Sequence, residues 1–262
     1  MLIDTHAHLT DAKLIQSLAE VLAVAHREGV VKIITIGTSL ADSQQAVELT
    51  QKHSEIYACV GVYPDEDQDL SINTISTNLS NLANQGKVVG IGETGIDIPK
   101  EGAPFNLLRQ EELFEAHIEL SRATKLPLII HNRGADTLVY DTLIKYKDKL
   151  QGGVFHCYTG DGEFAQKIIS LGFYISFSGI LTYKNAQLIQ DATRKIPIDR
   201  ILIETDAPYL TPHPFRGQVC EPKHVKTTAS KLAELLNMST EKVEEITYNN
   251  AVSLFPLLGK TI

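Results

Sequence analysis

Eight short apolar runs alternate with segments of helical periodicity along this chain of 262 residues, and this alternation constrains its fold more than any other feature. The apolar runs are rich in Val and Ile, whereas the segments between them repeat apolar residues three or four positions apart. Strands are therefore expected at residues 2–9, 30–37, 56–62, 87–93, 126–131, 153–156, 172–178 and 200–206. Helices are expected at residues 12–28, 41–53, 71–85, 106–124, 135–149, 162–170, 184–195, 221–237 and 240–253.

Eight strand–helix units in a chain of about 250 residues predict an α/β fold of the (β/α)8, or TIM barrel, type. We expect one domain over residues 1–262. The nearly continuous apolar strands suit a parallel sheet covered by helices, and an open doubly wound sheet is the competing architecture. The barrel is favoured because ionisable residues end five of the runs, where a barrel enzyme keeps its active site. They are His8, Glu93, His131, His156 and Asp206.

The first strand carries a polar face. Residues two apart in a strand share a face, so Asp4, His6 and His8 point one way while the residues between them point the other. Two imidazoles so placed can bind one metal ion at about 2.0–2.1 Å, and the carboxylate of Asp4 could orient one ring. The alternative is a surface strand end that happens to carry two histidines, because an isolated His-x-His pattern is a weak signal.

The other polar strand ends also have purely structural interpretations. Glu93, which has a glycine before it and another two positions later, could be a surface acid, His131 and His156 could be satisfied core histidines, and Asp206 could begin a turn. Five such coincidences at strand ends are improbable together. Four imidazoles and two carboxylates exceed the needs of one tetrahedral ion. They fit a pair of ions about 3.5–4 Å apart, joined by a carboxylate.

Charge and cysteine content narrow the class of protein. A net charge of −8 argues against a wide basic surface that would wrap duplex nucleic acid. Cys59, Cys157 and Cys220 have no paired spacing, which fits a reduced compartment. We expect a cytoplasmic protein with no membrane partner, since no apolar stretch approaches the roughly 20 residues that cross a bilayer. No obligate protein partner is evident.

An ordered set of motifs spans nearly the whole chain. They are Asp4-Thr5-His6-Ala7-His8, Gly92-Glu93-Thr94-Gly95-Ile96-Asp97, Ile130-His131-Asn132-Arg133, Phe155-His156-Cys157-Tyr158-Thr159-Gly160, Glu204-Thr205-Asp206-Ala207-Pro208-Tyr209-Leu210 and Arg216-Gly217. With these motifs the sequence resembles the TatD-like metal-dependent hydrolases, usually described as TatD-type deoxyribonucleases, within the amidohydrolase-like barrel group. The motif set is specific for the family and much less so for the substrate.

The resemblance implies a binuclear metal site. His6, His8 and Asp206 would hold one divalent ion, His131 and His156 a second, and Glu93 would bridge or serve both. The family is associated with zinc, magnesium or manganese. Ligand softness favours Zn²⁺ at a histidine-rich site and tolerates Mn²⁺ or Ni²⁺, whereas Mg²⁺ prefers more oxygen ligands.

In the expected mechanism a metal-activated water attacks a phosphorus or a carbonyl carbon, with Asp206 and Glu93 as the catalytic carboxylates. Asp206 would take the proton of the water. Glu204, two residues earlier and on the same face, would support a histidine. Arg133, and a second candidate in Arg216, would bind an anionic group of the substrate. For Arg216 a solvated loop arginine is an equal alternative.

Four positions, in three segments, depart from the family pattern. Gly61-Val62-Tyr63-Pro64-Asp65 stands where a Gly-Val-His-Pro-His sequence is common, so both histidines are replaced. Ile98 follows Asp97 where an aromatic or basic residue is common, and Cys220 precedes Glu221-Pro222 where Asn is common. None of these positions is a proposed metal ligand. The departures bear on substrate contacts, nucleic-acid contacts above all.

Three functions are compatible with this constellation. The first is a phosphodiesterase acting on single-stranded DNA or nucleic-acid ends, in which aromatic side chains would stack on bases. The aromatic candidates are Tyr63, Tyr158, Tyr183 and Tyr209. The second is an amidohydrolase-type enzyme that cleaves an amide or ester, such as a small molecule or an aminoacyl ester. The third, a metal-stabilised binding protein, is disfavoured because a closed structural zinc site needs only four ligands.

Overall fold

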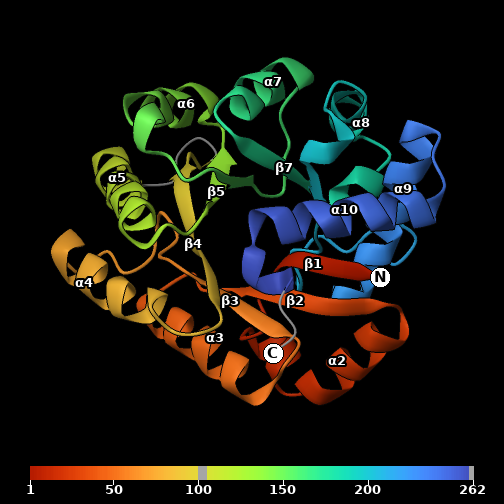
Figure 1. Cartoon of the computed structure of the whole chain (residues 1–262), viewed down its shortest axis with the longest axis horizontal. Helices are drawn as coiled ribbons and strands as arrows, with labels where there is room; N and C mark the ends of the chain where they lie inside the picture. Colours follow the sequence, from red (N-terminus) through yellow and green to blue (C-terminus); the bar gives the residue numbers. More distant parts are fainter. Residues whose placement is uncertain (100–104, 260–262) are drawn as a thin grey trace.

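Eight parallel strands form one sheet in the computed structural model, which describes residues 1–99 and 105–259 (Figure 1). The strands are β1 (Leu2–Ala7), β2 (Val30–Ile36), β3 (Ile56–Val60), β4 (Val88–Asp97), β5 (Leu128–Arg133), β6 (Gly153–Phe155), β7 (Phe173–Phe177) and β8 (Ile201–Ile203). Each strand pairs with the next one in the sequence. This sequential order excludes a doubly wound sheet and confirms the expected barrel.

The two edge strands of the sheet approach each other and nearly close the barrel. The hydroxyl of Thr5 donates to the carbonyl oxygen of Ile203 at 3.0 Å. Beyond β8, the backbone N–H of Asp206 donates to the carbonyl oxygen of His6 at 2.9 Å, and Ala7 and Ala207 form a parallel bridge. These contacts bring the chain after β8 beside the end of β1.

Helices connect consecutive strands and cover the outside of the sheet (Figure 1). The α-helices are α1 (Ala12–Ile15), α2 (Leu18–Arg27), α3 (Leu40–Lys52), α4 (Ile72–Ala83), α5 (Leu107–Thr124), α6 (Asp136–Lys145), α7 (Gly162–Ser170), α8 (Gln187–Thr193), α9 (Val225–Leu236) and α10 (Thr240–Leu254). The short 3₁₀ segments are η1 (Lys147–Lys149), η2 (Gly179–Thr182), η3 (Ile198–Arg200), η4 (Pro222–His224) and η5 (Pro256–Gly259). No helix in residues 1–99 or 105–259 has the length and apolar character needed to cross a membrane.

Several expected bounds shift: β5 ends at Arg133, two residues later than expected, and β8 ends at Ile203, three residues earlier. Two further elements also differ. The expected helix over 12–28 is two helices, α1 and α2, because Ser17 lies between them with φ −121° and ψ 23°, outside the helical region. Strand β4 extends four residues beyond its expected end at Glu93, to Asp97. Glu93 therefore lies within a strand rather than at its end.

The barrel interior is filled by strand side chains. One apolar cluster contains Ile34 and Ile36 of β2, Tyr57 and Cys59 of β3, and matching residues of β1, β4, β5, β6 and β8. Its only other buried members come from α10 and the segment after it, such as Phe255. Because helices α2 to α9 contribute nothing to this cluster, we place it inside the barrel, closed at one end by the C-terminal segment. A larger cluster packs the helices against the outside of the strands.

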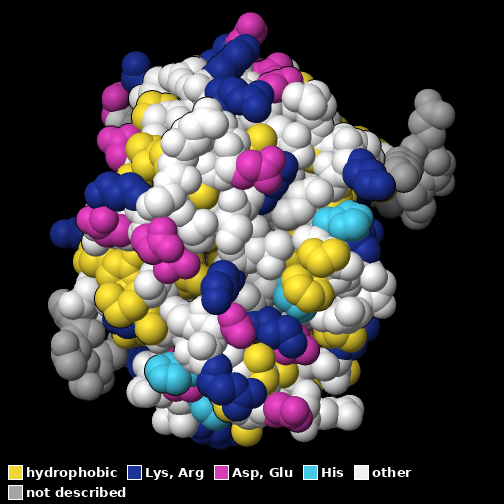
Figure 2. Space-filling view, turned by 90° about the vertical axis from the view of Figure 1, so that its right-hand side faces the viewer, with side chains coloured by type: hydrophobic (Ala, Val, Ile, Leu, Met, Phe, Trp, Pro, Cys, Tyr) yellow, Lys and Arg dark blue, Asp and Glu magenta, His cyan; other side chains and the backbone are white. Residues whose placement is uncertain are grey.

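The surface seen in Figure 2, the right-hand side of Figure 1, carries interspersed basic and acidic side chains. No continuous basic stripe crosses this face. This distribution agrees with the net charge of −8 and gives no track for a duplex on this side of the molecule.

Candidate active site

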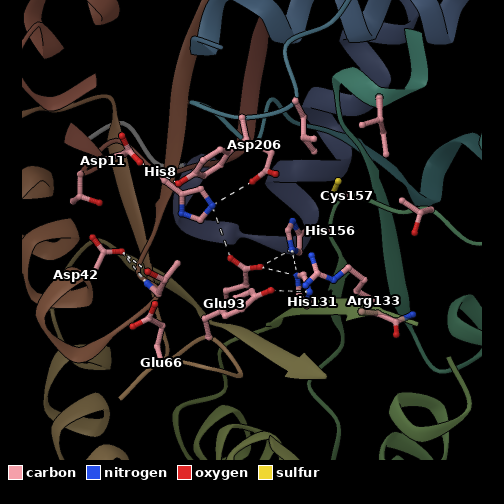
Figure 3. Close-up of a pocket in the computed structure, with 18 residues that line it drawn as sticks. His8, Asp11, Asp42, Glu66, Glu93, His131, Arg133, His156, Cys157 and Asp206 are labelled. Atoms are coloured by element: carbon pink, nitrogen blue, oxygen red, sulfur yellow. Dashed lines mark hydrogen bonds and ion pairs between the residues drawn. The ribbon is translucent and has the colours of Figure 1, made fainter. Parts of the chain in front are cut away.

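A pocket of about 780 Å³ opens at the carboxyl ends of the strands and contains most of the expected site residues (Figure 3). Side chains from β4 and from the ends of β1, β5, β6 and β8 point toward one another at its base. The six expected metal ligands are brought together here, although they are spread over 200 residues of sequence. They are His6, His8, Glu93, His131, His156 and Asp206.

One group of donor atoms surrounds Oε2 of Glu93. The Nε2 atoms of His6 and His8 lie 3.3 Å apart and 3.6 and 3.9 Å from this oxygen. Oδ1 of Asp206 lies 3.2 Å from Nε2 of His8 and 3.6 Å from Nε2 of His6. Ligands about 2.0–2.1 Å from a tetrahedral ion are about 3.4 Å apart, so the spacing suits one ion.

A second group surrounds the other oxygen of the same carboxylate. Oε1 of Glu93 lies 2.9 Å from Nε2 of His156 and 3.0 Å from Nδ1 of His131. These two nitrogens are 3.4 Å apart. Glu93 can therefore hold an ion with each oxygen. The mixed nitrogen and oxygen donors fit Zn²⁺, Mn²⁺ or Ni²⁺.

The backbone around Glu93 depends on two glycines. A Cβ atom added at Gly95, which has φ +136°, would lie 2.0 Å from the carbonyl oxygen of His131. A Cβ added at Gly92, with φ +142°, would lie 2.6 Å from the carbonyl oxygen of Ile129. Only glycine allows β4 to pass this close to β5 in these conformations. The close approach brings Glu93 and His131 within contact distance.

A hydrogen bond orients His8, and a carboxylate lies beside the ring of His156. Nδ1 of His8 lies 3.3 Å from the carbonyl oxygen of Ile36, which leaves Nε2 facing the cluster. Nδ1 of His156 lies 3.4 Å from Oε1 of Glu204, a fully buried carboxylate that also accepts from the backbone N–H of Cys157 at 2.7 Å. The sequence suggested that Glu204 supports a histidine, and its position suits support of His156.

Asp4 does not contact an imidazole ring in the way we expected. Its carboxylate accepts hydrogen bonds from the backbone N–H of Thr205 at 2.9 Å and from the hydroxyl of Thr205 at 2.6 Å. Nδ1 of His6 is buried and has no hydrogen-bond partner among the described residues. Asp4 thus joins β1 to the chain after β8, and burial raises its pKa to about 8. The expectation that Asp4 orients a histidine ring is therefore replaced by this structural role.

Electrostatics favour cations at the cluster. Burial opposes the ionised form of Glu93, but the charge of His156 and hydrogen bonds from His131 and His156 outweigh it and hold its pKa well below the ordinary value. The pKa of Asp206 is also lowered, because hydrogen bonding to His8 and nearby imidazole charge overcome burial. Burial disfavours the charged form of His8, yet Asp206 raises its pKa to about 9. Both carboxylates are therefore held as anions.

The two arginine candidates have different surroundings. Arg133 lines the pocket, and its Nε donates to Oδ1 of Asp97 at 2.5 Å. Arg216 is absent from the pocket lining, and its guanidinium stacks on the ring of Tyr183 at 4.2 Å while donating to the carbonyl oxygen of Thr211 at 3.1 Å. These contacts favour the alternative of a loop arginine, and substrate binding by Arg216 stays a prediction.

Two of the four tyrosines expected to stack on a base line the pocket, Tyr63 and Tyr209. Tyr158 is buried and donates its hydroxyl to the carbonyl oxygen of Asp161 at 2.6 Å. Tyr183 is covered by Arg216. Asp97, which contacts His131 and Arg133 from behind the pocket lining, was given no role from the sequence, because the expected strand stopped at Glu93.

Comparison with known proteins decides the family. The model of the family described as "TatD related DNase" matches residues 3–256. The chain belongs to the TatD-related DNase family.

TatD-family relatives cover the chain almost completely. The protein is 39% identical over 255 residues to YabD of Bacillus subtilis, an uncharacterized metal-dependent hydrolase, covering 97% of this chain and 99% of that protein. It is 36% identical to YcfH of Escherichia coli K12, described in the same words, covering 97% and 95% of the two chains. The crystal structure of YjjV, a TatD homolog of Escherichia coli K12, superposes with a TM-score of 0.90 at 27% identity, covering 97% and 98%. This protein is a metal-dependent hydrolase of the TatD family.

Four described residues depart from the TatD pattern, and of these four Tyr63 alone lines the pocket. Asp65 accepts a hydrogen bond from Nε2 of Gln110 at 2.8 Å, and the backbone N–H of Ile98 donates to the carbonyl oxygen of Arg133 at 2.9 Å. Cys220 is fully buried in the core. Tyr63 is therefore the departure that can alter substrate contacts directly.

Proposed function

We propose that this protein is a TatD-type deoxyribonuclease that uses two divalent ions to hydrolyse phosphodiester bonds at the ends of single-stranded DNA. The observation that carries the proposal is the position of Glu93, whose two oxygens face different sets of donors, His6 and His8 on one side and His131 and His156 on the other. A carboxylate with this arrangement suits a pair of ions that together serve an in-line displacement.

The ions would supply Lewis acidity and lower the pKa of water. Asp206 would accept the proton of the attacking water, because its carboxylate lines the pocket and its lowered pKa keeps it ionised. Arg133, fixed through Nε by Asp97, would direct its remaining guanidinium nitrogens to phosphate oxygens. Glu204 would hold His156 in place.

The size and lining of the pocket suit a strand end. A volume of about 780 Å³ lies within the range of about 300–1,000 Å³ usual for small-ligand sites, and it would admit a nucleotide or two. Tyr209 at the rim is 45% exposed and offers an aromatic face for a base.

One observation favours an amidohydrolase-type activity on a small amide or ester instead. Asp11, Asp42 and Glu66 line the wall of the pocket on the side away from Arg133 (Figure 3). Three carboxylates repel a polyanion that would extend along this wall, whereas they tolerate a neutral or cationic group. The same pair of ions would polarise a carbonyl group in this reaction.

A substrate panel separates the two activities. Metal-free protein is supplied with Mn²⁺ or Zn²⁺ and incubated with end-labelled single-stranded DNA and with a set of amide and ester substrates, including aminoacyl esters. We expect metal-dependent loss of nucleotides from the DNA that disappears in Asp206→Asn. Turnover of an amide or ester with intact DNA would replace the nuclease proposal by the amidohydrolase one. Retained DNA cleavage by folded Asp206→Asn would contradict the role of that carboxylate.

A further inference from the structure

Asp97 lies between two functional side chains without belonging to either donor group. It is the last residue of β4 and is only 1% exposed. In the register of β4 and β5, Gly95 is paired with His131 and Asp97 with Arg133. Because alternate residues of a strand share a face, this register places the Asp97 side chain beside those of His131 and Arg133.

The carboxylate of Asp97 uses both oxygens. Oδ1 accepts from Nε of Arg133 at 2.5 Å. Oδ2 lies 3.4 Å from Nε2 of His131 and accepts from the hydroxyl of Tyr63. The same hydroxyl lies 3.2 Å from Nε2 of His131, so the tyrosine, the histidine and the carboxylate form one polar triangle.

The backbone of Asp97 is held from the opposite side by helix α5. Oε1 of Gln110 accepts from the backbone N–H of Asp97 at 2.9 Å, and Nε2 of Gln110 donates to its carbonyl oxygen at 3.1 Å. Gln110 is itself 1% exposed, and Asp65 accepts its remaining amide hydrogen at 2.8 Å. The carboxylate therefore extends from a fixed point.

We propose that Asp97 is a positioning residue that orients both His131 and Arg133, and that the hydroxyl of Tyr63 completes its hydrogen bonding. With the proton of His131 on Nε2, which faces Oδ2 of Asp97 at 3.4 Å and the hydroxyl oxygen of Tyr63 at 3.2 Å, the lone pair of this ring lies on Nδ1, the atom that faces Glu93 and His156. One carboxylate thus sets the direction of a candidate metal ligand and of the candidate anion-binding guanidinium. The inference rests on the proposed two-ion site.

Calorimetric titration of the metal-free protein with Mn²⁺ tests this role without any assay of activity. We expect wild type to bind two ions and Asp97→Asn to bind one of them about 10–100-fold more weakly, as supporting partners of metal ligands typically do when removed. The affinity of the other ion, at His6 and His8, should stay unchanged. Titration of the Mn²⁺-loaded proteins with inorganic phosphate should show weaker binding by Asp97→Asn, because Arg133 loses its partner. Asp199→Asn, a matched neutral replacement in η3 just before β8 and outside the pocket lining, should behave as wild type in both titrations.

Each result has a separate meaning. A wild type that binds fewer than two ions would remove the proposed two-ion site itself. Two ions bound by Asp97→Asn with unchanged affinities, or both weakened equally, would overturn the positioning role, since a general loss of packing acts on both ions alike. If Asp97→Asn does not fold, Tyr63→Phe takes its place, because it removes one hydroxyl and keeps the ring. Weaker binding of one ion in that variant supports the role of the triangle, and unchanged affinity for both ions and for phosphate contradicts it.

Discussion

Nε2 of His156 lies 2.9 Å from Oε1 of Glu93 at the base of the pocket, and the second oxygen of this carboxylate faces His6 at 3.6 Å. A single side chain within β4 thus faces donors from β1 and from the residue after β6. This relationship links the two donor groups, so a change at Glu93 is expected to affect both.

Replacement of Glu93 by glutamine should reduce the number of bound ions. The amide keeps one carbonyl oxygen and places an NH₂ group, which cannot bind a cation, toward one of the two donor groups. Loss of one ion would remove several kcal/mol of transition-state stabilisation, which corresponds to a fall in the rate of hydrolysis of about 10³-fold. Metal content after dialysis and the initial rate of hydrolysis measure the two effects. Two tightly bound ions in Glu93→Gln would contradict the bridging position.

Replacement of Asp206 by asparagine should remove hydrolysis and keep the fold. General-base groups contribute about 10²–10⁴-fold, and an amide cannot accept the proton. Circular dichroism and a melting curve close to that of wild type would establish that the variant is folded. Activity within about tenfold of wild type would assign the proton to another group.

Removal of divalent ions should abolish activity and lower stability. Ions that bind only the folded protein stabilise it by about 2.7 kcal/mol at a hundred times their dissociation constant, a shift in melting temperature of roughly 5–10 °C. Melting curves with a chelator and after addition of Mn²⁺ or Zn²⁺ measure this shift. Full activity of protein shown by elemental analysis to be free of metal would contradict the proposed mechanism.

The two arginines should respond differently to the same substitution. Arg133→Gln should raise KM for a phosphodiester about 10–100-fold, since hydrogen bonds to charged groups contribute about 1.5–3 kcal/mol. Arg216→Gln should leave kcat and KM within about twofold, because the Arg216 side chain bonds to Tyr183 and Thr211 outside the pocket. Equal losses in both variants would show that Arg216 reaches the substrate.

His117 should make stability depend on pH between about 4 and 6.5. Burial lowers its pKa from 6.5 to about 4, and its neutral ring accepts from the backbone N–H of Val62 at 3.1 Å. Because this pKa is lower in the folded than in the unfolded protein, the neutral ring contributes its full stabilisation above about pH 6.5. This contribution to the free energy of unfolding, about 3 kcal/mol, is lost as pH falls toward 4. Urea unfolding of wild type and His117→Gln at pH 7 and pH 4 measures it. A difference between the two proteins that stays constant with pH would contradict the prediction.

Much of the metal centre was predictable because each candidate ligand belongs to a short local pattern. His6 and His8 alternate along one strand, His131 and His156 follow apolar runs directly, and Asp206 comes three residues after the run that ends at Ile203. In a parallel barrel the carboxyl ends of all strands meet at one rim, so the strand count alone placed these side chains together. Glu93 was found for the same reason, although its strand continues past it to Asp97.

The sequence alone was sufficient to predict the eight strand–helix units of the barrel and the six candidate ligands, because hydrophobic periodicity and strand ends are local properties of the chain. The partners of Asp4, Asp97, Arg133 and Arg216 depended on the folded chain. Asp4 faces Thr205 across 201 positions, and Arg216 lies on Tyr183 rather than in the pocket. Strand register and the close approach of β4 to β5 at Gly95 decide which polar groups meet. Both the register and the close approach arise only when distant segments of the chain pack together.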